Sequence, residues 1–590
     1  MQIYVPPSKL DDNVITPFMF GGVINGTDQA AVFQRMAASS ATVWYIPANT
    51  SWRIDSLITI SHDLIITGTG TLDFSQGNGG VLITGSLTQI SDLSLDVPKR
   101  SSVLSFTSTP DISNNDIIIL YNPTDFSWSN HRSYYREGEM VRVYSVSDNN
   151  VTIFGDTNDS YLAVDMDVYR LNGVKGIIRD IHVIPSANSN VPAIEIRNGI
   201  DCVFEDVRGA GGIYTVLALT RCYGFNIRGN NVINSSVVSG DEYGIAISNC
   251  QKGSIDGFTG HATRHCIALG GGSGPGCVPT RGLKISNCIL QNLKSSGVGS
   301  ADMHGNTDNI TYHNCIISHA NIAGRNNSYI DCTIYGRGNL DDPVYSDGAC
   351  IWGGEIVGGF FKIHGCKLIS EGNGQTYGYV YLAFSQYTGE DGLREDFHLD
   401  VDNITFIVPN ATSLSKLIWL EVNGLETKKV SVRVGRVNVL ETTQSMVAIL
   451  SIRDIASTAT LKSDYLIVDG PIDAPSGTYL ILPHSSSTNV PKRLMPQHVS
   501  TTVTCTNGNT SATSSSIGFR YPYPKIPDCH SVSIGSTDGF SKLTWGGRGL
   551  SSFCNTRSST SAILGVTAIG GNFSSTEDVR LTGVFGINEI

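Results

Sequence analysis

The side chains that could carry acid–base chemistry lie in one part of this 590-residue chain, between residues 241 and 355. Hydrolysis of a glycosidic bond needs one carboxylic acid that protonates the leaving oxygen and a second carboxylate that acts as nucleophile or activates water. Asp302 is the first candidate for one of these roles. The candidates for the other role are Asp241, Glu242, Asp347 and Glu355.

Histidine and arginine side chains accompany these carboxylates. Neighbouring carboxylates and arginines push each other's pKa values apart, so we expect one carboxyl group to stay protonated near neutral pH. His265 and His304 are expected to orient a carboxylate or to bind sugar hydroxyls. Arg264 and Arg325 suit an acidic substituent, as in a uronate or a pyruvyl group. Trp352 is a further candidate for substrate binding.

Each candidate also has a purely structural explanation. Asp302 could bond to the backbone of its own turn, as Asp often does. The two histidines lie close to glycines, where a histidine often has a structural role, and Glu242 and Glu355 could be ordinary solvent-facing charges. An aromatic segment with two arginines, residues 126–137, is either a sugar-stacking surface or the packed underside of a long excursion.

The candidates lie within a repeated phrase of β-forming residues, a small polar residue and a cysteine. Its irregular period predicts a solenoid whose coils differ in loop length. Parallel strands of successive coils lie about 4.8 Å apart, so equivalent side chains become neighbours over a trough of Gly, Ala and Ser. Aligning the phrases, which end at Cys250, Cys288, Cys315, Cys332 and Cys366, predicts one ladder of residues 246–248, 268–270, 298–301, 323–325 and 351–353.

Composition favours a β-rich protein with many turns. Charged residues make up only 16% of the chain, and 63 glycines separate short alternating strands. The net charge of -12 and the pI near 5.5 argue against a nucleic-acid partner, which needs a basic surface. No apolar run is long enough to span a membrane, and the N-terminus lacks the features of a secretory signal.

Cysteine usage points to packing. Ten of the 13 cysteines lie between Cys202 and Cys366, several of them at like positions in consecutive phrases. Stacked free thiols in an apolar interior explain this spacing better than disulfides do. No spacing suits a zinc site, and we expect no metal and no cofactor.

The expected domains follow from these patterns. Residues 1–55 form an N-terminal cap with a helix over 29–38, and residues 56–482 form the solenoid, interrupted by an insertion at about 100–172. A linker, 483–496, leads to a C-terminal β domain, 497–590, which resembles a sandwich and would cover the open strand edges of the last coil. The predicted fold is all-β, a right-handed single-stranded parallel β-helix.

Two stretches carry a resemblance to a known family. The Phe-Gly turn, short helix and Ile46-Pro47-Ala48 strand resemble the N-terminal cap of phage tailspikes and other pectin-lyase-like proteins, although Asn49 replaces the usual glycine. The phrases around Arg264-His265, the glycine run 270–272, Asp302, His304 and Arg325 are similar to a signature of tailspike-like polysaccharide depolymerases.

The resemblance implies an endoglycosidase acting on a bacterial capsular, O-antigen or exopolysaccharide. It also implies a homotrimer in a virion tail, or a bacterial exopolysaccharide glycosidase of the same build that acts outside the cell. Two alternatives stay open. A polysaccharide lyase would cleave beside a uronate and give products that absorb ultraviolet light, and an adhesin would bind glycan without shortening it.

Overall fold

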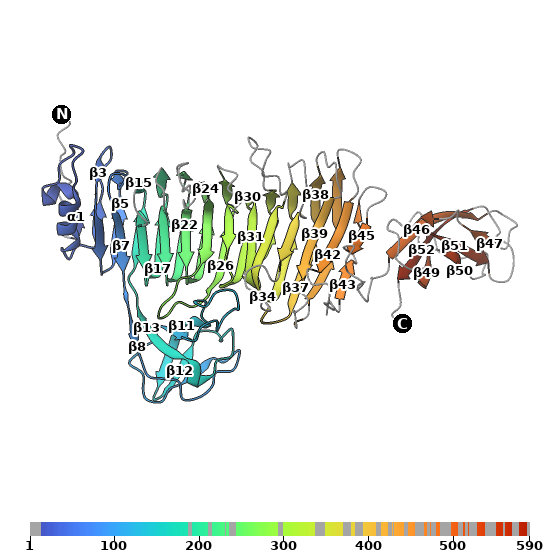
Figure 1. Cartoon of the computed structure of the whole chain (residues 1–590), viewed down its shortest axis with the longest axis horizontal. Coiled ribbons are helices and arrows are strands. Elements are labelled where there is room, and N and C mark those ends of the chain that lie inside the picture. Colours follow the sequence, from blue (N-terminus) through green and yellow to red (C-terminus); the bar gives the residue numbers. More distant parts are fainter. Residues whose placement is uncertain are drawn as a thin grey trace.

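The chain winds into a parallel β-helix, which confirms the predicted fold class (Figure 1). A coil near its middle contains β22 (Tyr243–Ser248), β23 (Gln251–Asp256) and β24 (Thr259–Ala262). The next coil contains β25 (His265–Gly270) and β26 (Thr280–Ser286), and each strand pairs in parallel with its counterpart one coil earlier.

The strands form three stacked ladders, two in one continuous sheet and the third in a separate sheet. The computed structural model describes residues 13–186, 191–210, 215–229, 232–234, 243–262, 264–292, 299–336, 349–369, 379–383, 393–408, 415–422, 428, 430–441, 447–454, 465–468, 472–473 and 479–483, together with the strands of a C-terminal domain.

The interior is filled by inward-facing aliphatic, aromatic and cysteine side chains. All ten cysteines between Cys202 and Cys366 are free and buried. They occupy more than one corner of the coil. Cys250 follows β22, whereas Cys288 follows β26, which belongs to a different ladder. The repeated phrase therefore marks two kinds of corner.

The register corrects the single ladder expected from the sequence. In β28 (Ala301–Met303), Ala301 pairs with Ile267 and Asp302 pairs with Ala268. In β31 (Ala320–Arg325), Ala320 is the residue opposite both Ala301 and Ile351, the first residue of β34 (Ile351–His364). The expected alignment placed residue 298 opposite Ala268, where the structure has Asp302. The connection before β28 is long, and aligning the repeated sequence phrase does not show how many residues a loop contains.

A short helix closes the N-terminal end. α1 (Ala30–Ala37) lies one residue inside each bound of the expected helix and buries Phe33 and Met36. The Phe33 ring contacts Trp44 and Trp52 edge to face, at centroid distances of 5.7 and 6.2 Å. Fully buried aromatic rings of this kind stabilise a cap by removing large apolar area from water.

The insertion is a small β domain beside the coils (Figure 1). Its six-stranded sheet contains β10 (Ile117–Tyr121), β11 (Gly138–Ser147) and β13 (Asp167–Asn172). It starts earlier than residue 100, because β8 (Ser86–Gln89) pairs with β13 rather than with a coil.

The last coil contains β45 (Tyr479–Pro483), and the C-terminal domain begins with β46 (Gln497–Cys505). Antiparallel strands form two sheets there, one of three strands and one of four. Among the described helices, none has the length and the apolar character needed to cross a membrane.

Candidate functional site

Asp302 lies at the centre of the candidate site. Its neighbours in β28, Ala301 and Met303, pack in the core, so strand alternation directs Asp302 to the outer face of the sheet. Side chains of adjacent coils cover it, and it is only 3% exposed. Asn321 Nδ2 donates to Oδ1 at 2.5 Å, while His304 Nε2 and His265 Nε2 lie 3.2 and 3.5 Å from Oδ2.

The carboxyl group of Asp302 is ionised. Burial alone would raise the pKa of Asp302, but the two imidazoles and the Asn321 amide outweigh it and hold that pKa well below its usual range. Burial lowers the pKa of His265, despite the nearby carboxylate. The Nδ1–H group of His265 donates to the Gly299 carbonyl oxygen at 2.6 Å, which fixes the ring.

His304 lies between two carboxylates. Its Nε2 faces Asp302, and its Nδ1 lies 3.7 Å from Oε2 of Glu355. Burial alone would lower the pKa of His304, but the negative charges of Asp302 and Glu355 raise it to about 10. The side chain of His304 is 34% exposed, so at neutral pH it presents a protonated imidazole to solvent.

The glycine run explains how the imidazole fits. A Cβ atom on Gly270 would lie 3.1 Å from Cδ2 of His304, and one on Gly271 would lie 1.9 Å from the Asn306 amide. These glycines therefore let two coils approach each other closely beneath the ring.

Glu355 is aimed at the site by its backbone. It lies at a β-bulge where β34 slips against β31, and its φ of +54° is in the left-handed region, which costs a non-glycine residue about 1–2 kcal/mol. Arg132 donates to Oε1 from Nη2 at 2.6 Å and from Nε at 2.9 Å. Oε2 accepts from the Gly305 N–H at 2.9 Å and from the Tyr135 hydroxyl at 3.1 Å.

Both described carboxylates of the site are therefore ionised, and the expectation of one protonated carboxyl group is wrong for this pair. Burial alone would raise the pKa of Glu355, but His304, then Arg132 and the Gly305 N–H, lower it to about 2. The exchangeable proton lies on His304 instead, because a cation between two anions is stabilised more strongly than a neutral carboxylic acid there.

The insertion supplies part of the site, which sequence reasoning missed. Tyr135 and Trp128 are buried, as in the packed-underside interpretation of the aromatic segment. Trp128 Nε1 donates to the Gly305 carbonyl oxygen at 2.7 Å, and His131 Nε2 lies 3.2 Å from the carbonyl oxygen of Ile356. The two arginines in that segment were the available signal, and one of them, Arg132, reaches Glu355.

The other predicted arginines have different surroundings. The guanidinium of Arg264, which is half-buried, lies 5.4 Å from the ring centre of Tyr243, and that ring lies 5.1 Å from the ring of His265. Arg325 is buried, and its Nη2 donates to Asp159 and to Asp308, each at 2.7 Å. Arg325 thus belongs to a buried ion network between insertion and coils rather than to the cluster around His304.

Trp352 lies in the same outward column as Asp302. It pairs in register with Asn321 on one side and with Tyr381, in β36 (Val380–Ala383), on the other. The rings of Trp352 and Tyr381 are nearly parallel, with centroids 6.5 Å apart. The remaining predicted carboxylates, Asp241, Glu242 and Asp347, lie outside the described residues.

A groove lies on the N-terminal side of the site. Its cavity of about 440 Å³ includes Tyr243, which contacts His265, and Ala246, which pairs with Ala268 of the Asp302 column. Small side chains at the floor let a polymer approach the sheet closely. Besides these two, its lining includes Glu195, Arg197, Ala218 and Ser248.

The part of the chain that the structure describes contains no group of three or more side chains placed to hold a metal ion.

Two family models match the chain. The model described as Gp49, pectin lyase-like, matches residues 210–478, which include the candidate site. The model described as Tailspike protein-like, Ig-like domain, matches residues 82–171, the insertion. No curated protein matches the chain.

Solved structures match over almost the whole length. Tailspike gp61 of Pseudomonas phage phi297 is 29% identical with a TM-score of 0.81, and the match covers 98% of this chain and 100% of that one. Tailspike gp49 of Pseudomonas phage LKA1 is 26% identical with a TM-score of 0.78, over 98% and 100%. Gp54 of Acinetobacter baumannii bacteriophage AP22, solved with A. baumannii capsular saccharide, is 23% identical with a TM-score of 0.77, over 98% and 97%.

Proposed function

We propose that the chain is a bacteriophage tailspike, because two tailspike-type family models and two Pseudomonas phage tailspikes match it, and that it depolymerises a bacterial surface polysaccharide by hydrolysing internal glycosidic bonds at His304. Like the AP22 tailspike, whose structure contains capsular saccharide, it would act on a glycan of the host surface: a capsule, an O-antigen or an exopolysaccharide. We also propose that it works as a homotrimer in the virion tail.

One observation carries the choice of His304. Among the described members of the site, Asp302 and Glu355 are ionised and almost wholly buried, whereas the protonated ring of His304 is partly exposed. Its Nδ1 is too far from Glu355 for a short hydrogen bond, so a glycosidic oxygen could accept that proton. General acid catalysis of this kind contributes about 10²- to 10⁴-fold in rate.

The hydrolytic cycle balances through His304. His304 gives its proton to the leaving oxygen as the bond to the anomeric carbon breaks, and a water molecule adds to that carbon. The water passes a proton to the now neutral ring of His304, which is partly exposed, and this restores the protonated ring. Asp302, whose Oδ2 lies 3.2 Å from Nε2 of His304, stabilises that protonated ring.

Arg132 favours a second candidate reaction, β-elimination beside a uronate. The side chain of Arg132 is 36% exposed, and its Nη2 lies 3.4 Å from Nδ1 of His304. That contact is a hydrogen bond only when His304 is neutral, because a protonated imidazole has no acceptor. A guanidinium that neutralises the uronate carboxylate, next to a neutral imidazole that removes the adjacent proton, is a suitable pair for elimination.

Digestion of purified polysaccharides tests the proposal. The protein is incubated with capsule, lipopolysaccharide and exopolysaccharide of candidate hosts, with the Asp302→Asn variant as control. Hydrolysis gives shorter chains with new reducing ends and no new ultraviolet absorbance, whereas elimination adds the absorbance of an unsaturated uronate. A polymer that is bound by the protein and never shortened would identify an adhesin and contradict depolymerisation.

A further inference from the structure

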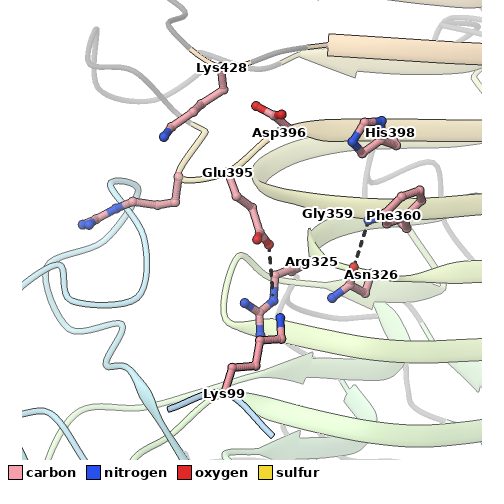
Figure 2. Close-up of a pocket in the computed structure, with 10 residues that line it drawn as sticks. Lys99, Arg325, Asn326, Gly359, Phe360, Glu395, Asp396, His398 and Lys428 are labelled. Atoms are coloured by element: carbon pink, nitrogen blue, oxygen red, sulfur yellow. Dashed lines mark hydrogen bonds and ion pairs between the residues drawn. The ribbon is translucent and has the colours of Figure 1, made fainter. Parts of the chain in front are cut away.

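A second cavity lies outside the site around His304 (Figure 2). It has a volume of about 470 Å³ and opens where the end of β31, the second half of β34 and the start of β37 (Phe397–Asp402) come together near the insertion. The described residues that line it include four cationic side chains, two carboxylates and one phenylalanine: Lys99, Arg325, Arg394, Lys428, Glu395, Asp396 and Phe360.

An exposed aromatic pair forms one wall. Phe360 is 60% exposed, and its ring stacks on His398 with centroids 4.6 Å apart and planes inclined by 19°. The bend of β34 at Gly358 and Gly359, with φ values of +135° and +81°, turns Phe360 outward. The Phe360 N–H donates to Asn326 Oδ1 at 2.8 Å, which fixes the backbone that carries this ring (Figure 2).

The floor offers a donor and an acceptor. Nε of Arg325 and Oε1 of Glu395 are buried and lie 3.6 Å apart, facing each other in Figure 2. Neither atom makes a hydrogen bond with the described residues. A buried donor and acceptor without hydrogen bonds cost free energy unless a water or a ligand hydroxyl satisfies them. Burial raises the pKa of Glu395, against the charge of Arg325.

The rim carries positive charge from three separate segments. Lys99 comes from the insertion, Arg394 from the segment before β37, and Lys428 from the segment before β40 (Val430–Val434). Arg394 also donates to the carbonyl oxygen of Phe126, which ties this rim to the insertion. Lysine and arginine that converge on one cavity favour a carboxylate among the ligand's substituents.

We propose that this cavity is a non-catalytic subsite for a carboxylate-bearing sugar residue of the polysaccharide. The Phe360 ring contacts the apolar face of the sugar, Arg325 and Glu395 bind its hydroxyls, and the rim cations bind its carboxylate. The inference rests on the proposed function, because a polysaccharide substrate is what makes a sugar the expected ligand. Glu355 and Phe360 lie on the same strand, five residues apart, so one polymer chain can contact both places.

Ligand-observed NMR with trigalacturonate and with its neutral methyl ester tests the subsite. We expect the wild-type protein to bind the acid with a Kd of about 1 mM and the ester at least about fivefold more weakly, because only the acid carries carboxylates. Phe360→Ala should weaken binding of the acid about tenfold. The matched control is Phe154→Ala, which removes another exposed phenylalanine, 53% exposed and located on the insertion, and should leave binding unchanged.

Asp302→Asn separates this inference from the proposed function. If the subsite exists, Asp302→Asn retains binding of trigalacturonate, whether or not the protein proves to be an enzyme. Three results would each overturn the subsite. Phe360→Ala and the wild type could bind trigalacturonate with equal affinity, the wild type could bind the acid and the ester with equal affinity, or Asp302→Asn could be the variant that removes binding while Phe360→Ala does not. Absence of any binding at about 20 mM trigalacturonate would do the same.

Discussion

Replacing Arg132 by alanine tests whether the insertion completes the active site. Arg132 lies in the insertion, and Glu355 lies on the coils, more than 200 residues away in the sequence. The substitution removes both hydrogen bonds to Oε1 of Glu355 but leaves those from Tyr135 and the Gly305 N–H to Oε2. Glu355 therefore stays in place with less positive charge around it.

The magnitude follows from the contacts that are lost. A hydrogen bond to a charged group contributes about 1.5–3 kcal/mol, and the exposure of the Arg132 side chain reduces the total through solvent screening. We expect a loss of about 1–2 kcal/mol in transition-state stabilisation, a fall of about 10- to 30-fold in kcat/KM. Because Arg132 lowers the pKa of Glu355, its removal should also shift the acid limb of the pH–rate profile upward.

The assay is the release of reducing ends from the polysaccharide across a pH series, with and without added guanidinium chloride. Arg142→Ala is the matched control, because Arg142 also joins the insertion to a carboxylate of the coils, Asp201, at 3.2 Å but on the exposed surface. We expect guanidinium to restore part of the Arg132→Ala activity. A loss of equal size in both variants, with no shift of the acid limb, would refute a role for Arg132 beyond attaching the insertion.

Three further results are expected. Asp302→Asn should reduce cleavage at least about 10²-fold while circular dichroism and oligomeric state stay unchanged; retained activity would remove Asp302 from the mechanism. The pKa of His304 is raised on folding, so the protonated ring stabilises the folded protein fully below about pH 6.5, and this contribution is lost as the pH rises through about 10. Between these two pH values, the free energy of unfolding in urea should fall for the wild type relative to His304→Gln. Truncation after Leu482 should give monomer or aggregate by light scattering, and an intact trimer would show that the C-terminal domain is not needed for assembly.

The sequence predicted the β-helix and the Asp302–His304 pair because both depend on short-range patterns. Alternating strands and the glycine run are readable within a few residues, and residues 302 and 304 lie on one strand end. The sequence could identify Glu355 only as a candidate carboxylate. Its orientation depends on a β-bulge, a shift in register between β31 and β34 that no local sequence pattern reveals.

The contributions of the insertion could not be predicted in the same way. Arg132 and Tyr135 reach the site through a domain that docks from the side, so their contacts span more than 200 residues of sequence. The buried partners of Arg325 were missed because a sequence phrase does not show that Asp159, also in the insertion, lies beside it. The protonation pattern likewise depends on which charges surround His304 in space.

A crystal structure of Asp302→Asn with a bound oligosaccharide of its substrate tests whether His304 is the general acid. We predict a glycosidic oxygen within about 2.6–3.2 Å of a ring nitrogen of His304, with the sugar chain continuing into the groove beside Tyr243. A well-ordered oligosaccharide whose every glycosidic oxygen lies far from His304 would contradict it.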